Sequence, residues 1–156
     1  MATTTVYANN DAELRKAAGV SDGLLTVGRI ALALIFVMSG IEKAMGIGAT
    51  AQMIGSKGLP APMALAYAAA ALELIGGVLI VIGWQTRIVA LALAVFTAIA
   101  SFFFHDFWHM SGPEQTNNMI QFMKNVSIIG GFLMLAAAGA GRFSVDGPCT
   151  VHAKKA

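Results

Sequence analysis

The chain alternates between long apolar stretches and short polar connections. The four apolar stretches cover residues 23–45, 61–84, 87–105 and 119–140. Each is close to the ~20 residues that an α-helix needs to cross a ~30 Å hydrocarbon layer. The pattern therefore predicts an all-α integral membrane protein, with an antiparallel bundle of four transmembrane helices within residues 23–142. Residues 1–22 form a polar amino-terminal segment, and residues 143–156 form a tail.

The connections refine this bundle. Residues 46–60 are rich in glycine and close on Pro60, so they are expected to be a loop. Residues 83–86 are too few for anything but a tight turn, which predicts that the second and third helices form an antiparallel hairpin. Residues 107–118 are predicted to be a longer polar loop that Gly112 and Pro113 interrupt. Residues 11–22 are compatible with a short helix lying on the membrane surface.

Composition supports a lipid environment. Hydrophobic residues make up 57% of the 156 residues and charged residues only 12%, and the mean hydropathy is +0.72. Soluble domains usually carry about 25% charged residues. The formal net charge is only +2, and the basic residues are scattered, which argues against a nucleic-acid partner. Cys149 is the only cysteine, so a disulfide within the chain and a cysteine zinc site are excluded.

The start of the chain and the distribution of positive charge predict the orientation. The first apolar stretch begins only at residue 23 and lacks an A-x-A cleavage site, so we expect it to be a retained helix. Basic residues are concentrated in the amino-terminal segment, the central turn and the tail. The positive-inside rule therefore predicts that both termini lie in the cytoplasm. The basic residues on that side are Arg15, Lys16, Arg29, Arg87, Arg142, Lys154 and Lys155.

Glu73 is the residue that is most costly to place in a membrane. It lies in the middle of the second apolar stretch, and no residue near it on its own helix can neutralise it. Lys124 or Lys43 is the expected partner from another helix. Asn118, Gln121 and Asn125 repeat along one face of the fourth helix, and a polar stripe in a membrane helix should face inward.

These polar groups predict one pocket in the outer half of the bilayer. Its candidate residues are Glu73, Lys43, Lys124, His105, Asn118, Gln121 and Asn125. One interpretation is a binding site for a quinone or a similar amphiphile, whose polar head would accept hydrogen bonds from lysine and histidine. The alternative is a purely structural network that fixes the register of the helices. A third is a small proton-linked transporter with Glu73 as the relay, although no internal repeat supports it.

Two further features have simpler interpretations. Arg29 lies near the cytoplasmic end of the first helix, where its side chain is expected to extend to lipid phosphates. His105 and His109 have the H-D-x-x-H spacing of some zinc sites, and Glu114 could supply a third ligand. The motif lies where a helix leaves the membrane and has Asp where zinc hydrolases favour Glu, so we expect no metal site.

An ordered set of short motifs resembles the DoxX family of small bacterial membrane proteins over about residues 24–146. The motifs are Gly28-Arg29, Ser39-Gly40 with Lys43, residues 57–60, Glu73-Leu74 with Gly76-Gly77, residues 83–87, residues 104–108, Asn118-Met119, Lys124-Asn125, Gly130-Gly131, and Gly141-Arg142 with Ser144 and Asp146.

The resemblance implies a four-helix, multi-pass protein of the bacterial inner membrane. Relatives in that family include a subunit of a thiosulfate:quinone oxidoreductase and members that associate with redox-defence proteins. The resemblance thus implies a membrane subunit or scaffold of an oxidoreductase system, and a non-enzymatic assembly or stress protein is the alternative. Its partners would be membrane lipid, a redox enzyme or another membrane subunit, or further copies of the chain. The sequence shows no cysteine pair, haem motif or nucleotide fingerprint, so no intrinsic cofactor is expected and quinone is the only candidate.

Overall fold

The computed structural model describes residues 2–147, with side chains from residue 19 onward, and every element within this range is helical. The predictions on Cys149 and on the last residues of the tail lie outside the described residues. In chain order the elements are α1 (Ala2–Met45), α2 (Ile47–Ser56), α3 (Pro62–Ile82), α4 (Thr86–Phe104), the 3₁₀ helix η1 (Phe107–His109) and α5 (Gly112–Ala138).

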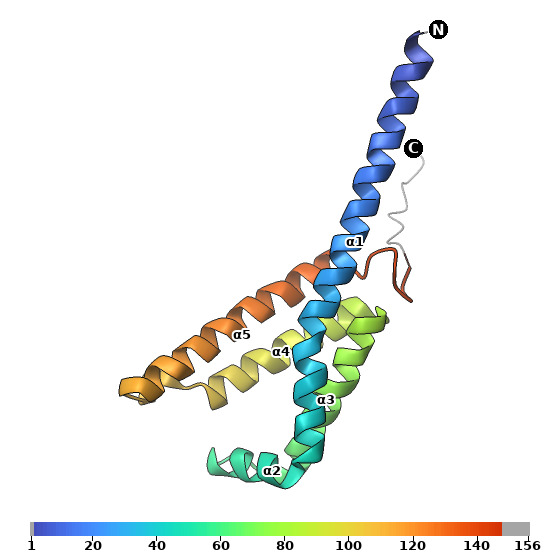
Figure 1. Cartoon of the computed structure of the whole chain (residues 1–156). Helices are drawn as coiled ribbons and strands as arrows, with labels where there is room; N and C mark the ends of the chain where they lie inside the picture. Colours follow the sequence, from blue (N-terminus) through green and yellow to red (C-terminus); the bar gives the residue numbers. More distant parts are fainter. Residues whose placement is uncertain (1, 148–156) are drawn as a thin grey trace, which may run out of the picture.

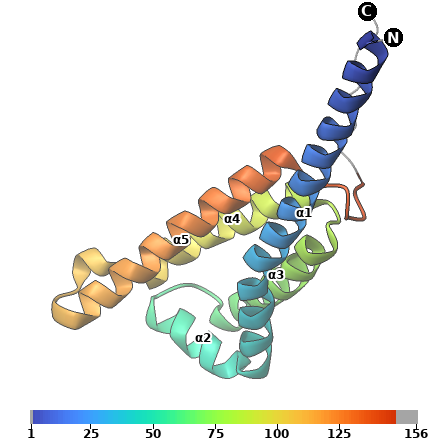
Figure 2. The same ribbon diagram turned by 45° about the horizontal axis from the view of Figure 1, so that its top comes forward.

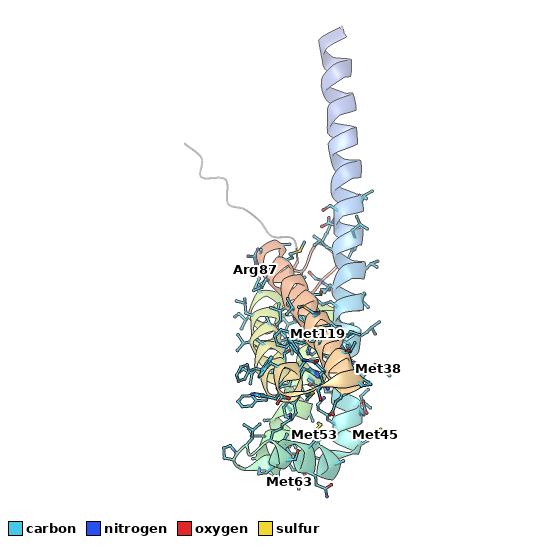
Figure 3. The ribbon with its side chains drawn as sticks, turned by 90° about the vertical axis from the view of Figure 1, so that its left-hand side faces the viewer. Met38, Met45, Met53, Met63, Arg87 and Met119 are labelled. Carbon is cyan, nitrogen blue, oxygen red and sulfur yellow. The ribbon has the colours of Figure 1, made fainter. Side chains whose placement is uncertain are left out.

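Within the described residues, four helical segments are long and apolar enough to cross a membrane. They are Gly19–Met45, Pro62–Ile82, Thr86–His109 and Gly112–Ala138. The four predicted membrane helices and the all-α fold are confirmed. Large apolar side chains cover the outside, including the exposed Met38, Met45 and Met63 (Figure 3). Such an outer surface requires lipid around it.

The structure corrects three of the predicted boundaries. Residues 11–22 are helical, but they continue α1 and do not form a separate surface helix. Residues 47–56 form α2 where a loop was expected, because Ile54, Ala51 and Thr50 give this segment one buried face. α5 begins at Gly112 because Pro113 fits the first turn of a helix, where its missing N–H has no acceptor to lose.

The long helices form two pairs that diverge. α1 packs mainly against α3, and α4 packs mainly against α5. The pairs meet where Ala33 and Phe36 face Phe132, and they spread apart toward the end that contains α2 (Figures 1 and 2). We call that end the cavity end, and the opposite end, where residues 139–147 lie, the tail end. The predicted tight turn between α3 and α4 is present, with Gly83 and Gln85 in the left-handed region.

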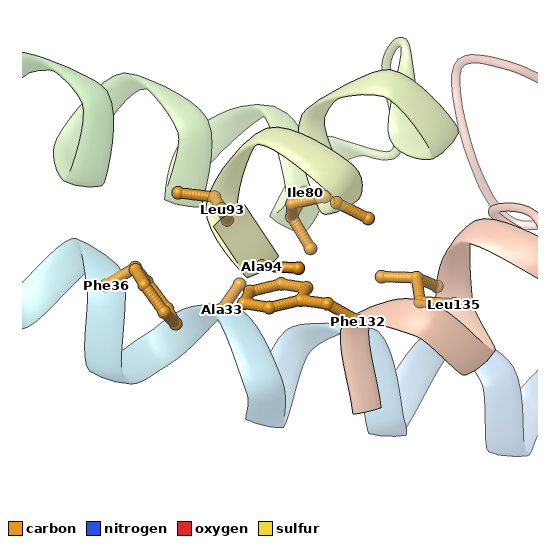
Figure 4. Packing of buried hydrophobic residues seen from close by; sticks show 8 residues of the cluster. Ala33, Phe36, Ile80, Leu93, Ala94, Phe132 and Leu135 are labelled. Carbon is orange, nitrogen blue, oxygen red and sulfur yellow. The ribbon is translucent and has the colours of Figure 1, made fainter. Parts of the chain in front are cut away.

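The main core fills the space where all four long helices meet. The rings of Phe36 and Phe132 pack edge to face with their centroids 5.1 Å apart, and Ile80 and Leu93 complete the centre (Figure 4). The other members of this cluster are Ala33, Ala90, Ala94 and Leu135. Because the cluster lies toward the tail end, it holds the two pairs together there and leaves them free to separate at the cavity end.

Small residues bring the helices close, but not at every glycine. A Cβ atom at Gly77 would lie 2.8 Å from the side chain of Val37, and one at Gly131 would lie 3.2 Å from that of Leu32. A Cβ atom at Gly130 would meet nothing within 4 Å. The closest approach between two helix backbones occurs at Gly40 of α1, where a Cβ atom would lie 2.5 Å from the backbone nitrogen of Leu74. The backbones of α1 and α3 therefore touch at Gly40.

Candidate functional site

A cavity of about 570 Å³ lies at the cavity end between α2, α3 and α4. Most of its wall is apolar. The apolar lining residues are Met53, Ile54, Leu59, Leu65, Ala68, Ala69, Leu72, Phe96, Ile99, Ala100, Phe103 and Phe104. The polar lining residues are Lys43, Thr50, Lys57, Glu73 and His105. The wall thus combines a large apolar surface with a few polar groups, which is the usual composition of a small-molecule site.

Glu73 and Lys43 form an ion pair in the wall of this cavity. The ammonium of Lys43 lies 2.9 Å from Oε2 of Glu73, and it also donates to Oγ of Ser39 at 2.6 Å. Glu73 is buried, with 6% of its surface exposed. The predicted pairing of Glu73 with a lysine of another helix is therefore present, and the partner is Lys43.

The close contact at Gly40 explains why Lys43 reaches Glu73. Because α1 and α3 touch where Gly40 meets Leu74, the next turn of α1 lies beside Glu73. Ser39 and Lys43 are four residues apart and share one face of α1, so Ser39 can hold the ammonium in place. A bulkier residue at position 40 would separate the helices and lengthen the ion pair.

A second ion pair joins the two diverging helix pairs at the cavity end. The ammonium of Lys57, directly after α2, lies 2.8 Å from Oδ1 of Asp106, which follows α4. The ring of Phe104 packs against an apolar cluster formed by Ala51, Ile54 and Ala66. The sequence did not single out Lys57 or Asp106 as site residues, because they lie 49 positions apart, one in an expected loop and the other at the end of a predicted helix.

His105 connects the cavity wall to α5. Its Nδ1 lies 3.2 Å from the side-chain oxygen of Asn118, so the contact is a hydrogen bond when Nδ1 carries the proton. That tautomer leaves Nε2 as an acceptor, and protonation would make Nε2 a second donor. The predicted neighbours His105 and Asn118 therefore do meet, with the imidazole in the wall and the amide behind it.

The remaining predicted pocket residues lie elsewhere. Lys124, Gln121 and Asn125 are not among the residues that line the cavity. The ammonium of Lys124 donates to Oε1 of Gln121 on its own helix, so the alternative pairing of Lys124 with Glu73 is not formed. The reason is the divergence of the helix pairs, which carries the start of α5 away from α3 (Figure 1).

The described residues contain no group of three or more His, Cys, Asp or Glu side chains placed to hold a metal ion. α4 ends at Phe104, and residues 107–109 form a 3₁₀ turn, so His105 and His109 do not share one face of a continuous α-helix. His109 instead lies 3.7 Å from Oδ2 of Asp106.

Arg29 occupies a buried site at the tail end, and its predicted extension to lipid phosphates is wrong. Only 3% of its surface is exposed. Its Nη1 donates to the carbonyl of Ala140 at 2.8 Å, and its Nη2 donates to that of Phe143 at 2.9 Å. Residues 139–147, which we call the tail segment, cover the guanidinium and supply acceptors that the sequence pattern did not reveal.

The tail segment also completes the turn between α3 and α4. The carboxylate of Asp146 accepts the N–H groups of Gln85 and Thr86, each at 2.8 Å, at the start of α4 where backbone donors lack helical partners. Burial opposes the ionisation of this carboxyl, but the hydrogen bonds and the positive charge of Arg29 outweigh it and hold the pKa of Asp146 below its ordinary value. Gly83, with a φ of 70°, lies against Arg29 where a Cβ atom would come within 2.2 Å of Nη1.

Comparisons with known proteins agree with this architecture. The sequence profile of the DoxX family matches residues 24–106. The chain is 42% identical over 123 residues to the inner membrane protein YphA of Escherichia coli (strain K12), which covers 79% of this chain and 88% of YphA. It is 38% identical over 123 residues to the inner membrane protein YqjF of the same strain, with 77% and 87% covered.

A third relative covers less of the chain. CatD of Bacillus subtilis (strain 168), assigned provisionally to the oxidoreductases, is 46% identical over 67 residues, which are 43% of this chain and 48% of CatD. No solved structure matches the chain. The matched profile, the two long alignments and the four membrane-spanning helices lead to one conclusion: the chain is a multi-pass inner-membrane protein that belongs to the DoxX family.

Proposed function

We propose that the protein binds the head group of a quinone, or of a chemically similar amphiphile, in the cavity between α2, α3 and α4. The observation that carries the proposal is the position of Lys43, Lys57 and His105 on the wall of an otherwise apolar cavity. A quinone has the matching chemistry, because its ring and chain are apolar and its two carbonyl oxygens accept hydrogen bonds.

The size of the cavity supports this assignment. About 570 Å³ falls within the ~300–1,000 Å³ typical of small-molecule sites. The rings of Phe96, Phe103 and Phe104 give the wall flat apolar surfaces that suit an aromatic or quinonoid ring. The two lysines are already paired with carboxylates, so the site carries little excess charge and suits a neutral ligand.

The proposed role in the cell is that of a membrane subunit of an oxidoreductase system. CatD, a relative over part of the chain, is assigned provisionally to the oxidoreductases, which supports this role. The chain would bind and orient the quinone, and a partner subunit would carry the redox cofactor.

The test measures binding of decylubiquinone to the purified protein in lipid nanodiscs. Ala69 lines the cavity, whereas Ala64 lies on the same helix outside it and is exposed. We expect Ala69→Phe to lower the affinity at least tenfold by filling the cavity, and the control Ala64→Phe to leave it unchanged. His105→Ala should weaken binding by a smaller factor, because it removes the Nε2 group that donates to a quinone carbonyl when the imidazole is protonated.

Each result separates the proposal from its alternatives. Equal binding to Ala69→Phe and to the unsubstituted protein, with both folded, would contradict the proposal. If no quinone binds and Glu73→Gln changes only thermal stability, the ion pair has a structural role. Proton flux into liposomes that disappears with Glu73→Gln would support a transporter instead.

A further inference from the structure

The fifth helix carries a lysine that lacks a partner of opposite charge within the described residues. Lys124 lies in the middle of α5, its side chain is exposed, and its ammonium donates to the neutral amide of Gln121. A cation at this depth normally faces protein, because lipid cannot solvate it. α5 is also the least buried of the four membrane spans. The face that carries Lys124 is therefore suited to contact with another protein surface.

The first helix carries the complementary charge. Glu42 lies in the last turn of α1 and is exposed, and in the described part of the chain no hydrogen bond or ion pair engages its carboxylate. Its neighbour Lys43 is held by Glu73 in the cavity wall and is not available to it. Between the main core and the cavity end, α1 thus exposes the carboxylate of Glu42 and α5 the ammonium of Lys124, and the two groups have opposite charges.

Glu42 and Lys124 lie at similar distances along their helices from a level that the two helices share. The contact between the rings of Phe36 and Phe132 defines a common level on α1 and α5. Glu42 follows Phe36 by six residues toward the cavity end, and Lys124 precedes Phe132 by eight residues toward the same end. At ~1.5 Å per residue, the two groups lie about 9 Å and about 12 Å from that level, measured along their own helix axes. A pair between them would need little vertical displacement.

Within one chain the two groups are held apart. α5 diverges from α1 toward the cavity end (Figures 1 and 2). The position of the α4–α5 pair is fixed there by the ion pair of Lys57 with Asp106 and by the packing of Phe104. Closing the gap between α1 and α5 would strain both contacts, so a pair between different chains satisfies the charges at lower cost.

We propose that two copies of the chain associate through this surface, with Lys124 of each copy paired to Glu42 of the other. A twofold axis along the membrane normal repeats the contact, so the interface contains two ion pairs between Lys124 and Glu42. Both charges of each copy are then neutralised. The partner is a second copy because this chain itself supplies the opposite charge at the matching depth. The proposal does not depend on what the cavity binds.

The test is disulfide cross-linking in native membranes, in a Cys149→Ser background. One copy carries Glu42→Cys and another, with a different tag, carries Lys124→Cys, and oxidation should give a mixed dimer. Val126→Cys is the matched control, because Val126 is exposed, lies two residues further along α5 and faces the opposite side. We expect at least tenfold less mixed dimer with Val126→Cys than with Lys124→Cys.

Two outcomes would overturn the proposal. The first is equal cross-linking at positions 124 and 126, or none at either. The second comes from a single chain that carries both Glu42→Cys and Lys124→Cys. A disulfide that forms only within that chain would mean that α1 and α5 close on each other. Charge reversal provides an independent measurement: Glu42→Lys alone should lower the dimer fraction in nanodiscs, and adding Lys124→Glu should restore it. A double variant that dimerises no better than the single variant, when both are folded, would argue against the ion pair.

Discussion

The ammonium of Lys43 lies between the carboxylate of Glu73 at 2.9 Å and the hydroxyl of Ser39 at 2.6 Å. It thereby ties α1 to α3 at membrane depth, where an uncompensated charge would be costly. The same ammonium is on the wall of the cavity. One side chain therefore contributes to the stability of the bundle and to the polarity of the candidate site, and the two contributions must be separated by experiment.

Removal of Glu73 should destabilise the protein because it leaves the partly buried ammonium of Lys43 at membrane depth without a counter-charge. We expect Glu73→Leu to lower the free energy of unfolding by about 3–5 kcal/mol, the usual cost of breaking a buried ion pair. The double variant Glu73→Leu with Lys43→Met should recover most of this loss, because both charges are gone. Unfolding of the detergent-solubilised protein measures both. Equal loss in the single and double variants would show that the unpaired charge of Lys43 is not the cause of the loss.

The contact between α1 and α3 at Gly40 should tolerate no side chain. Gly40→Ala places a methyl group 2.5 Å from the backbone nitrogen of Leu74, so the helices must separate, at a cost of about 1–3 kcal/mol. Gly28→Ala is the matched control on the same helix, because its Cβ atom would meet nothing within 4 Å. Thermal unfolding of both variants gives the comparison. If Gly28→Ala destabilises as much as Gly40→Ala, the close approach is not the cause.

The sequence predicted the membrane helices well because their apolar runs match the thickness of a bilayer. It could not predict α2, which has only ten residues, includes Gly48 and Gly55, and buries its apolar face mainly against α3, with Phe104 of α4 packed beside it. The partner of Glu73 was predicted as one of two lysines. The choice between Lys43 and Lys124 depends on the crossing of α1 and α3 at Gly40 and on the divergence of α5, which are properties of packing and not of hydrophobic pattern.

The ion pair of Lys57 and Asp106 should control access to the cavity, because it joins the two helix pairs at the end where they separate. Asp106→Asn should therefore speed up, by a few-fold, the reaction of a cysteine at position 69 with a maleimide, in a Cys149→Ser background. Glu114→Gln is the control, since Glu114 is an exposed acid in the first turn of α5. The same rate in Asp106→Asn and the control would rule out this role.

The tail segment should detach in acid. Because the pKa of Asp146 is lowered in the folded protein, its contribution to stability is fully present above the ordinary value of 3.8 and is lost as the pH falls through the folded value. We expect the amide protons of Gln85 and Thr86 to exchange faster as the pH drops below 3.8, after correction for intrinsic exchange. Asp146→Asn should show fast exchange already at neutral pH. Exchange that is independent of pH in this range would contradict the assignment.

The buried site of Arg29 has a consequence for biosynthesis. Ala140, which accepts its hydrogen bond, is made 111 residues later, after all four membrane helices. While the ribosome synthesises the intervening residues, the guanidinium in the newly inserted α1 must be accommodated by lipid headgroups or by the insertion machinery. The tail end can therefore assume its final form only after translation has passed Phe143 and Asp146. The helices can be placed in the membrane one by one, but this end of the bundle is completed only after residues 140–146 have been made.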